Sequence, residues 1–370
     1  MFKKLICIVV VSLLCVLSIT GCGSTGSTGG SGGGGSSNFK KPDKPLDLDF
    51  SSIDWSSQPE IRIIWAIAQS ANSAGGQNIT IAMQDIGEKT GGKVRFELSG
   101  DAVLVDEAGM LEALESGLCQ IVKQTPSVNV GLIPELECLV YPGFYNGNLE
   151  RFAEFNRAIQ PPIADIYKDH GFKQFSPNPT GTSGLLIKKM QITKPEDLKG
   201  MLLRASGASL AKVIETYGAS STVLGLGDVP TALDRGTIDG LFSSTSMMID
   251  MHFTEVAKNL TVLAFREMLG DYSMSQKWYD SLTPEMQAVI DYYGDKYFDV
   301  VISRVDVTER ENIEKAKSEG VNVLELTAEQ SQPFADALKP LFEDFGKRTS
   351  DKGRALLKVI YDYNNWNWAF

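Results

Sequence analysis

Arg204 is the residue whose type and position point most directly to chemistry. It ends an apolar run, 201–204, that reads as a buried strand, and the loop 205–208 follows it. In open α/β sheets, ligands bind at the carboxyl ends of the strands. A guanidinium at that edge can hold a carboxylate through two parallel hydrogen bonds. A structural ion pair is the alternative role, and sequence position alone leaves both roles open.

The elements that must position Arg204 follow from the pattern of residues 195–240. After the strand come a helix at 209–217 closed by Gly218, a strand at 221–224, a helix capped by Asp228, and a strand opened by Ile238. Strands that alternate with short helices predict a parallel sheet with crossover connections.

Three other kinds of site were considered, a phosphate-binding loop, a zinc site and a nucleophilic serine, and the sequence lacks residues that each requires. Segment 87–94 approximates a phosphate-binding loop, but Val94 replaces the required Ser or Thr, and the segment follows a helix and enters a strand, the reverse of the required order. The two histidines, His170 and His252, lack zinc-site spacing, and no G-x-S-x-G elbow is present. The sequence therefore predicts no metal, no cofactor and no enzymatic activity.

The N-terminus predicts export and lipid attachment. Lys3 and Lys4 precede an apolar run, 5–19, that is short for a membrane span and has the layout of a secretory signal. The run leads into Thr-Gly-Cys22, which resembles a bacterial lipoprotein signal, whose cysteine is acylated and becomes the first mature residue. We expect a signal peptide at 1–21 and lipidation at Cys22; the alternative is an ordinary signal peptide that contains a cysteine.

A flexible tether is expected after Cys22. Residues 23–38 are almost entirely Gly, Ser and Thr, a composition that cannot bury enough surface to fold. As a random coil this segment would span about 20–25 Å. Residues 39–59 read as an extended approach to a fold that starts near Glu60. The net charge of −11 argues against nucleic acid as a partner.

A single long helix is predicted late in the chain. Thr283 is a suitable N-cap, Pro284 suits the first helical position, and the pattern continues to about residue 318. Such a helix is roughly 50 Å long, longer than one lobe is wide, so we expect it to brace two lobes. The Pro- and Gly-rich crossing 176–182 is the predicted hinge between them. The remaining predicted strands are 60–65, 94–98, 119–122, 138–141, 184–187, 260–265 and 271–275, and the remaining helices are 77–89, 107–116, 149–158, 161–170, 328–349 and 352–366.

Several segments together resemble the solute-binding proteins of tripartite ATP-independent periplasmic (TRAP) transporters. They are TGGKV at 90–94, LEALESG at 111–117, PEDLKG at 195–200 with Arg204, ALDRGTIDG at 232–240, and KWYDSLTP at 277–284. The resemblance covers about residues 60–365. It implies a periplasmic-binding-protein-like fold in which two α/β lobes close at a hinge over a small organic acid and deliver it to membrane subunits. It also implies that Arg204 is the carboxylate-binding arginine.

The sequence departs from this family at three places. Where many members carry a second arginine, Gly184 is nearest in spacing. Leu241 to Ser244 replace a Gln-Glu-Asn segment, and the acidic residue of sialic-acid-binding members corresponds to Gln124 or Thr125. These departures suggest a smaller or less polar monocarboxylate as the ligand.

Candidate ligand contacts are residues at strand ends that face the expected cleft. Trp65 packs on the ligand or fills the core, the commoner fate of tryptophan. Leu226 is a candidate apolar lid and Tyr145 a weaker contact. The polar candidates beside Arg204 are Gln124, Thr125, Ser183, Gly184, Ser243, Ser244 and Thr245. Cys119 and Cys138 either form a disulfide or remain two buried thiols.

The sequence thus predicts a lipid-anchored, extracytoplasmic binding protein for a small carboxylate that works with TRAP membrane subunits. The first lobe is expected at 60–181 plus about 269–310, and the second at 182–268 plus about 311–370. One alternative is a ligand sensor of the same fold that signals to an envelope receptor. The other is an envelope hydrolase.

Overall fold

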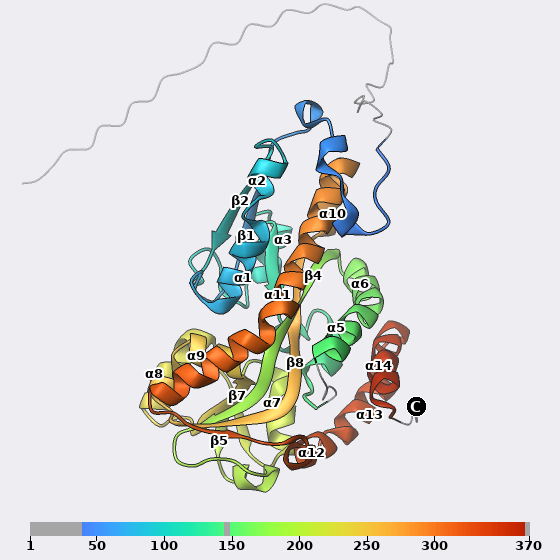
Figure 1. Cartoon of the computed structure of the whole chain (residues 1–370). Coiled ribbons are helices and arrows are strands. Elements are labelled where there is room, and N and C mark those ends of the chain that lie inside the picture. Colours follow the sequence, from blue (N-terminus) through green and yellow to red (C-terminus); the bar gives the residue numbers. More distant parts are fainter. Residues whose placement is uncertain (1–38, 144–148, 367–370) are drawn as a thin grey trace, which may run out of the picture. The chain divides into compact units, whose positions relative to one another are not determined.

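The computed structural model describes residues 39–143 and 149–366, with the backbone alone at 267–269 (Figure 1). The predicted signal peptide, Cys22 and Tyr145 therefore lie outside the described residues. Within the described ranges no helix combines the length and the apolar character that crossing a bilayer requires.

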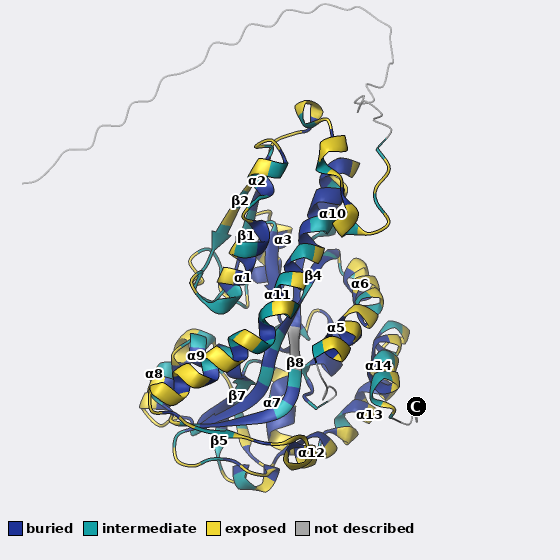
Figure 2. Ribbon diagram, viewed as in Figure 1, coloured by how far each residue is buried: buried dark blue, intermediate teal, exposed yellow. Residues whose placement is uncertain are grey.

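One mixed sheet organises the described chain. Its strand order is β2-β1-β3-β8-β4-β7-β5-β6, and β9 pairs with β8. The strands are β1 Ile61–Ala66, β2 Val94–Ser99, β3 Ile121–Gln124, β4 Phe172–Ile187, β5 Leu202–Ala205, β6 Ser220–Val223, β7 Gly240–Ser244, β8 Asn259–Ser275 and β9 Asn322–Glu325. The central strands β3, β4, β5 and β7 are largely buried, whereas β2, β6 and β9 are partly exposed and the helices expose their outer faces (Figure 2).

The first lobe is built around β2, β1 and β3. In it β1 pairs in parallel with both neighbours, and Ile63 and Trp65 of β1 are fully buried. Ser73 starts the first helix, because its Oγ accepts a hydrogen bond from the backbone N–H of Gly76 at 3.2 Å. The helices are α1 Ala74–Met83, α2 Ile86–Lys89, α3 Met110–Glu115, α4 Pro126–Asn129, α5 Leu149–Ala158 and α6 Gln160–Asp169.

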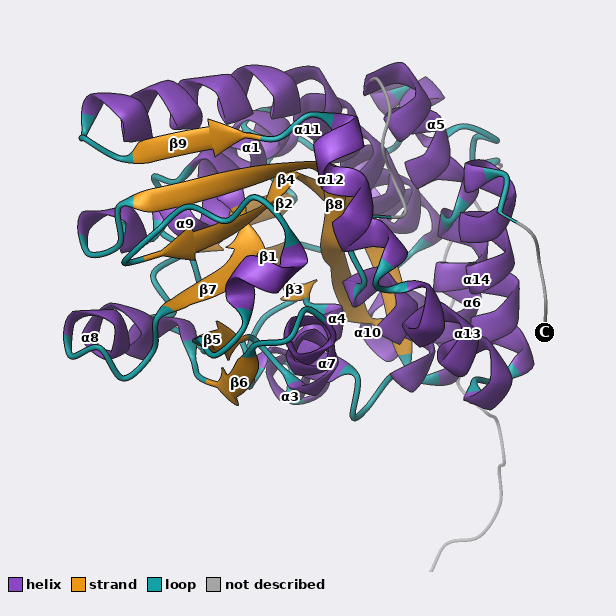
Figure 3. Cartoon of the chain, turned by 90° about the horizontal axis from the view of Figure 1, so that it is seen from below, coloured by secondary structure: helices purple, strands orange, loops and turns teal. Residues whose placement is uncertain are grey.

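The second lobe is built around β7, β5 and β6, which lie side by side in Figure 3. As predicted, β5 is parallel to both neighbours. Helix α7 (Ala208–Thr216) ends before Gly218, whose φ of 89° is the left-handed conformation that glycine tolerates. Helices α8 (Val229–Asp234) and α9 (Thr245–Asp250) follow, although the Asp228 side chain makes no capping bond to α8.

Strands β4 and β8 are antiparallel partners that join the two lobes. The crossing 176–182, predicted as a hinge loop, is part of β4, and the predicted strands 260–265 and 271–275 are one strand, β8. Pairing between β4 and β8 shifts register four times between Gln174 and Gly184. Proline cannot donate to a ladder, and Pro177 and Pro179 lie within this irregular stretch. The sequence showed the irregularity but not that the backbone remains paired.

The long helix α11 (Pro284–Ser318) has its predicted bounds. Thr283 Oγ1 accepts from the Met286 N–H at 3.2 Å and so caps the helix. It contacts α1 of the first lobe and α9 of the second. A Cβ at Gly294 would lie 2.3 Å from the Phe175 carbonyl oxygen, so glycine there lets β4 pack directly on the helix. The predicted bracing role therefore agrees with these contacts.

Four further expectations need correction. Residues 138–141 are not a strand: 138–140 belong to the 3₁₀ helix η4 (Pro134–Val140), and Tyr141 is its C-cap. Segment 39–59 is not merely extended: it forms η1 (Pro45–Asp47), η2 (Phe50–Ser52) and η3 (Trp55–Ser57), and Leu48 and Ile53 are buried. Helix 77–89 is divided into α1 and α2. Helix 328–349 is divided into α12 (Ala328–Asp336) and α13 (Lys339–Arg348), because Pro340 cannot continue α12.

The remaining elements complete the chain. They are η5 Pro195–Leu198, η6 Leu226–Asp228, η7 Phe253–Glu255, α10 Gln276–Asp280 and α14 Asp351–Asn364. Cys119 and Cys138 are buried free thiols, the second of the two states left open by the sequence. Burial raises the pKa of the Cys119 thiol to about 11.

Candidate functional site

Arg204 lies near the end of β5 and is only 2% exposed. Its Nε donates to the Leu224 carbonyl oxygen at 2.9 Å. No carboxylate among the described residues lies within 4.0 Å of the guanidinium, and its two terminal nitrogens donate to none of the described side chains. Burial lowers the pKa of Arg204, and the negative charge of Glu107 opposes that shift. The structure thus contains no structural ion pair at Arg204 within the described residues.

A cavity opens at the guanidinium, and we call it the Arg204 cavity. Its apolar walls include Leu226, Phe242 and Met247 from the second lobe. The polar side chains that line it are Glu107, Lys123, Thr125, Ser127, Arg204, Ser206 and Ser243. A mostly apolar pocket with a few convergent polar groups is typical of small-ligand sites.

The two lobes meet beside this cavity. Ser127 Oγ of α4 and Ser206 Oγ, just after β5, are 2.7 Å apart. A Cβ at Gly207 would lie 1.7 Å from the Ser127 carbonyl oxygen, so only glycine permits this approach. Lys212 of α7 also forms an ion pair with the buried Glu137 at 3.0 Å. The Arg204 cavity is therefore covered by both lobes.

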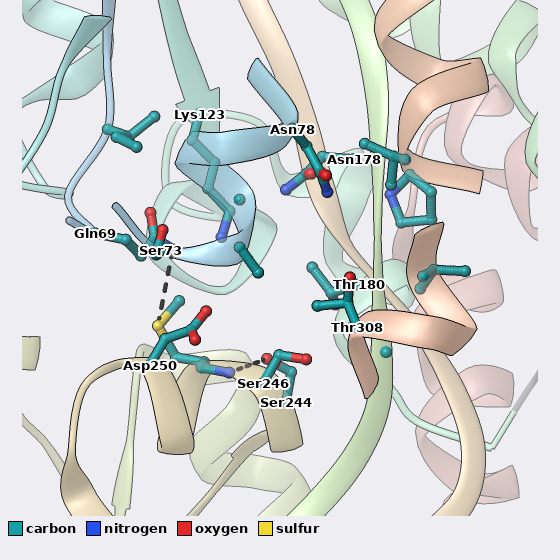
Figure 4. Close-up of a pocket in the computed structure, with 18 of the residues that line it drawn as sticks. Gln69, Ser73, Asn78, Lys123, Asn178, Thr180, Ser244, Ser246, Asp250 and Thr308 are labelled. Carbon is teal, nitrogen blue, oxygen red and sulfur yellow. Dashed lines mark hydrogen bonds between the residues drawn. The ribbon is translucent and has the colours of Figure 1, made fainter. Parts of the chain in front are cut away.

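A second cavity, which we call the polar cavity, shares Lys123 and Met247 with the first. Lys123 comes from the first lobe and Asp250 from the second, and Figure 4 shows their charged ends directed toward the space between them. Burial raises the pKa of Asp250. The other polar side chains on its walls are Gln69, Ser73, Asn78, Asn178, Thr180, Ser244, Ser246 and Thr308. Most of the side chains that line the polar cavity can therefore form hydrogen bonds with a ligand.

Lys123 is the main residue that sequence reasoning missed. It lies in β3, is 3% exposed and lines both cavities. A lysine inside an otherwise apolar strand is uncommon, because burying its charge costs free energy. Its presence in the apolar run was the sequence signal that could have marked Lys123 as a site residue. Arg204 is consequently not the only cation at the site.

Comparison with known proteins identifies the architecture. The family model DctP, described as bacterial extracellular solute-binding protein, family 7, matches residues 67–349. This chain belongs to that family. It is a solute-binding protein of the TRAP type, and transport binding proteins, not enzymes, make up the family.

Relatives of this solute-binding protein include periplasmic proteins with named ligands. The ectoine-binding periplasmic protein TeaA of Halomonas elongata is 27% identical over 67% of this chain and 74% of its own length. A solute-binding protein of Verminephrobacter eiseniae is 25% identical over 82% of this chain and 89% of its own.

Solved structures show the same two-lobe fold. The ectoine-binding protein of the Halomonas elongata TRAP transporter has a TM-score of 0.75 at 23% identity, covering 82% of this chain and 99% of that protein. A Bordetella pertussis receptor that binds pyroglutamic acid has a TM-score of 0.72 at 18% identity, covering 81% and 99%. These likenesses confirm the predicted fold class.

The structure brings part of the predicted ligand set of this solute-binding protein together. Thr125, Leu226 and Ser243 line the Arg204 cavity, and Ser244 lines the polar cavity. Thr125 Oγ1 donates to Glu107 Oε1 at 2.6 Å. Ser244 Oγ also accepts from the Met247 N–H at 3.2 Å and so caps α9.

Two predicted contacts of the first lobe lie elsewhere. Trp65 fills the core: its ring centroid lies 4.6 Å from that of Tyr272 and 5.0 Å from that of Phe175, and it lines neither cavity. Gln124 is fully buried, and its Oε1 accepts from Asn129. Both predictions took a position at a strand end as evidence of exposure to the cleft.

Three predicted contacts of the second lobe are packed inside the protein: Ser183 and Gly184 in β4, and Thr245 at the start of α9. Ser183 and Thr245 are fully buried and line neither cavity, and Thr245 Oγ1 donates to the Thr182 carbonyl at 3.0 Å. Gly184 lies in β4, where a Cβ would be 2.7 Å from Cε of Met248. A larger side chain at Gly184 would therefore require the end of the Met248 side chain to move.

Proposed function

We infer that this protein is a lipid-anchored, extracytoplasmic TRAP solute-binding protein that holds a small monocarboxylate through Arg204. Family membership supports the role in transport, and the side chains of the site support the choice of ligand class. As in other two-lobed binding proteins, the ligand would stabilise the closed state through contacts with both lobes.

The observation that carries this proposal is the buried guanidinium with open donors. Arg204 is 2% exposed and lines a cavity, yet it pairs with no carboxylate of the described residues. Removing a charge from water is costly unless it gains partners. A ligand carboxylate placed in the cavity would provide them through charge-assisted hydrogen bonds.

The packing at Gly184 supports a ligand with one carboxylate. Many family members carry a second arginine near this position, but here the space is filled by Met248 and Leu260. Solved TRAP solute-binding proteins of similar fold hold β-D-galacturonate and L-malate, both organic acids. A monocarboxylate with an apolar body fits the one arginine and the walls formed by Leu226, Phe242 and Met247.

The direct test is a thermal-shift screen of mono- and dicarboxylates on the purified protein, followed by calorimetry. A ligand that binds only the folded state raises the melting temperature. We expect monocarboxylates to give the largest shifts. A screen in which only neutral sugars or dicarboxylates bind would contradict the proposal.

The lipid anchor has its own test. Its support is the sequence around Cys22 and the Gly/Ser tether that follows. Cys22→Ser should move the protein from the membrane fraction to the soluble fraction of cells, while ligand binding is unchanged. Retention of the variant in the membrane fraction would contradict lipidation at Cys22. No observation on the described residues favours the sensor or the hydrolase.

A further inference from the structure

Glu107 lines the Arg204 cavity. Among the described residues, only one of its two carboxylate oxygens receives a hydrogen bond. Its Oε1 accepts from Thr125 Oγ1 at 2.6 Å, which fixes the orientation of the carboxylate. Its Oε2 accepts from none of the described residues, and no Lys, Arg or His of the described chain lies within 4.0 Å of it. One oriented acceptor therefore remains open in a ligand cavity.

Arg204 presents the opposite situation in the same cavity. Its Nε donates to the Leu224 carbonyl oxygen, and its terminal nitrogens have no hydrogen-bond partner among the described residues. The negative charge of Glu107 opposes the lowering of the Arg204 pKa that burial causes, but the two side chains form no ion pair. The protein thus holds a cation and an anion apart on the walls of one cavity.

An anionic ligand would satisfy only one of these two groups. Its carboxylate would pair with Arg204, and Glu107 would then face a neighbouring negative charge with no cation of its own. A ligand that carries both charges would pair with both side chains. Like charges brought together in a desolvated cavity cost free energy, whereas opposite charges with hydrogen-bond geometry gain it.

The charges on the two cavities agree with this arrangement. The described charged residues that line them are the cations Arg204 and Lys123 and the carboxylates Glu107 and Asp250. A third cavity, which Arg204 and Glu107 also line, adds the carboxylates Asp101, Asp106 and Asp228, so a ligand meets more anionic than cationic side chains around Arg204. The apolar walls formed by Leu226, Phe242 and Met247 leave room for a compact hydrocarbon body between the charged ends.

We propose that the ligand is a zwitterionic monocarboxylate, with its carboxylate on Arg204 and its cationic nitrogen on Glu107. This assignment rests on the proposed function and narrows its ligand class. Glu107 is then the residue that separates zwitterions from simple organic acids.

Three matched pairs of probes test the assignment by calorimetry at millimolar concentration. In each pair a zwitterion has a near-isosteric anion: N,N,N-trimethylglycine with 3,3-dimethylbutanoate, proline with tetrahydrofuran-2-carboxylate, and pipecolate with cyclohexanecarboxylate. We expect proline or pipecolate to bind about tenfold or more tightly than its anionic partner, the effect of one charge-assisted hydrogen bond, whereas trimethylglycine, which has no N–H, gains only the charge attraction to Glu107.

Glu107→Gln keeps the acceptor for Thr125 and removes the charge. It should abolish the preference for the zwitterion and leave binding of the anion equal or stronger. Glu112→Gln, an exposed residue of α3, is the matched control. Equal thermal unfolding of both variants would show that folding is intact. Asp250→Asn tests the other carboxylate and should change the preference less.

The outcomes separate this inference from the proposed function. If the anions bind as tightly as the zwitterions and depend on Arg204, the zwitterion assignment is overturned and the proposed function stands. If no zwitterion binds, the assignment is also overturned, and failure of the anions as well would remove the proposed function with it. Loss of the preference in Asp250→Asn but not in Glu107→Gln would overturn the role of Glu107.

Discussion

Two buried charged residues, Arg204 and Glu309, have opposite relations to the protein around them. Glu309 of α11 is 8% exposed, and its Oε1 accepts from both the backbone N–H and the hydroxyl of Thr182 in β4. Its Oε2 accepts from Ser246 Oγ of α9 at 3.0 Å. Arg204 is buried more deeply, yet its only hydrogen bond to the described residues is to Leu224.

This difference distinguishes a buried charged residue that stabilises the fold from one that is available to bind a ligand. Glu309 ties the bracing helix to β4 and to the cleft wall at α9, and the protein supplies its donors. Gly181 packs against this carboxylate, since a Cβ there would lie 1.7 Å from Glu309 Oε2. Arg204 keeps donors that only a molecule in the cavity can use. Changes at Arg204 should therefore alter affinity, and changes at Glu309 should alter stability.

The largest expected effect is that of Arg204→Ala on affinity. Loss of the charge-assisted hydrogen bonds would leave a bound carboxylate unpaired, at a cost of about 3–5 kcal/mol, so calorimetry should show affinity falling a hundredfold or more. The melting temperature of the ligand-free variant should fall only slightly, because the hydrogen bond from Arg204 Nε to the Leu224 carbonyl is lost but no ion pair within the described residues is. Arg62→Ala, at an exposed arginine that pairs with Glu97, is the control. A variant that bound its ligand normally would remove Arg204 from the site.

Asp271 of β8 lies between these two extremes. Its Oδ2 accepts from the Tyr167 hydroxyl at 3.1 Å, whereas Oδ1 is buried and accepts from none of the described residues. Burial raises the pKa of Asp271 from 3.8 to about 7. The folded protein therefore favours the protonated form. The stability that this form contributes is complete below pH 3.8 and is lost as the pH rises to about 7.

Asp271→Asn should remove this pH dependence, because the amide is neutral throughout. Relative to the variant, the wild type should lose about 2–4 kcal/mol of unfolding free energy between pH 4 and pH 7. Urea unfolding of both proteins at these pH values measures the difference. Asp234→Asn, at an exposed position, is the control. If the wild-type and Asp271→Asn curves remain parallel across this range, Asp271 is not protonated in the folded state.

The sequence predicted the position of Arg204 well, because the alternation of strands and helices across 195–240 is strong and local. It also predicted both ends of α11 from the cap at Thr283 and the long gap between helix breakers. The lobe limits remain a prediction. Both predictions succeeded for the same reason. The strand with Arg204 and the ends of α11 are determined by residues that are close in the sequence, and not by contacts with distant segments.

The errors at the site come from strand register and from side chains that distant elements cover. Strand β3 was expected at 119–122 but spans Ile121–Gln124, so Lys123 and Gln124 belong to the strand and not to the loop after it. Their side chains point to opposite faces: Gln124 lies in the core, and Lys123, not considered, lines the cavities. Trp65 shows the second cause, since Phe175 and Tyr272 enclose its ring from β4 and β8.

Glu309→Gln tests the structural side of the comparison. The amide keeps one acceptor oxygen for Thr182, but its NH₂ group can pair with Ser246 only if that hydroxyl turns to accept, so the hydrogen bonds to an ionised carboxylate are replaced by weaker neutral ones. We expect a loss of about 1–3 kcal/mol in unfolding free energy with little change in ligand affinity. Glu311→Gln, exposed on the same helix, is the control. A large loss of affinity at unchanged stability would instead assign Glu309 to the ligand site.

The smallest expected effect is that of Ser246→Ala, which removes a single donor to Glu309 Oε2. Its cost should be about 1 kcal/mol in urea unfolding. Because Ser246 and Glu309 share one hydrogen bond, their effects should not add: the double variant should be more stable than the sum of the single losses implies. Additive losses would mean that the two side chains act independently and that α9 is not held by the bracing helix through this bond. A coupling comparable with the Ser246→Ala loss would instead show that the protein itself satisfies the buried carboxylate, in contrast to the open donors of Arg204.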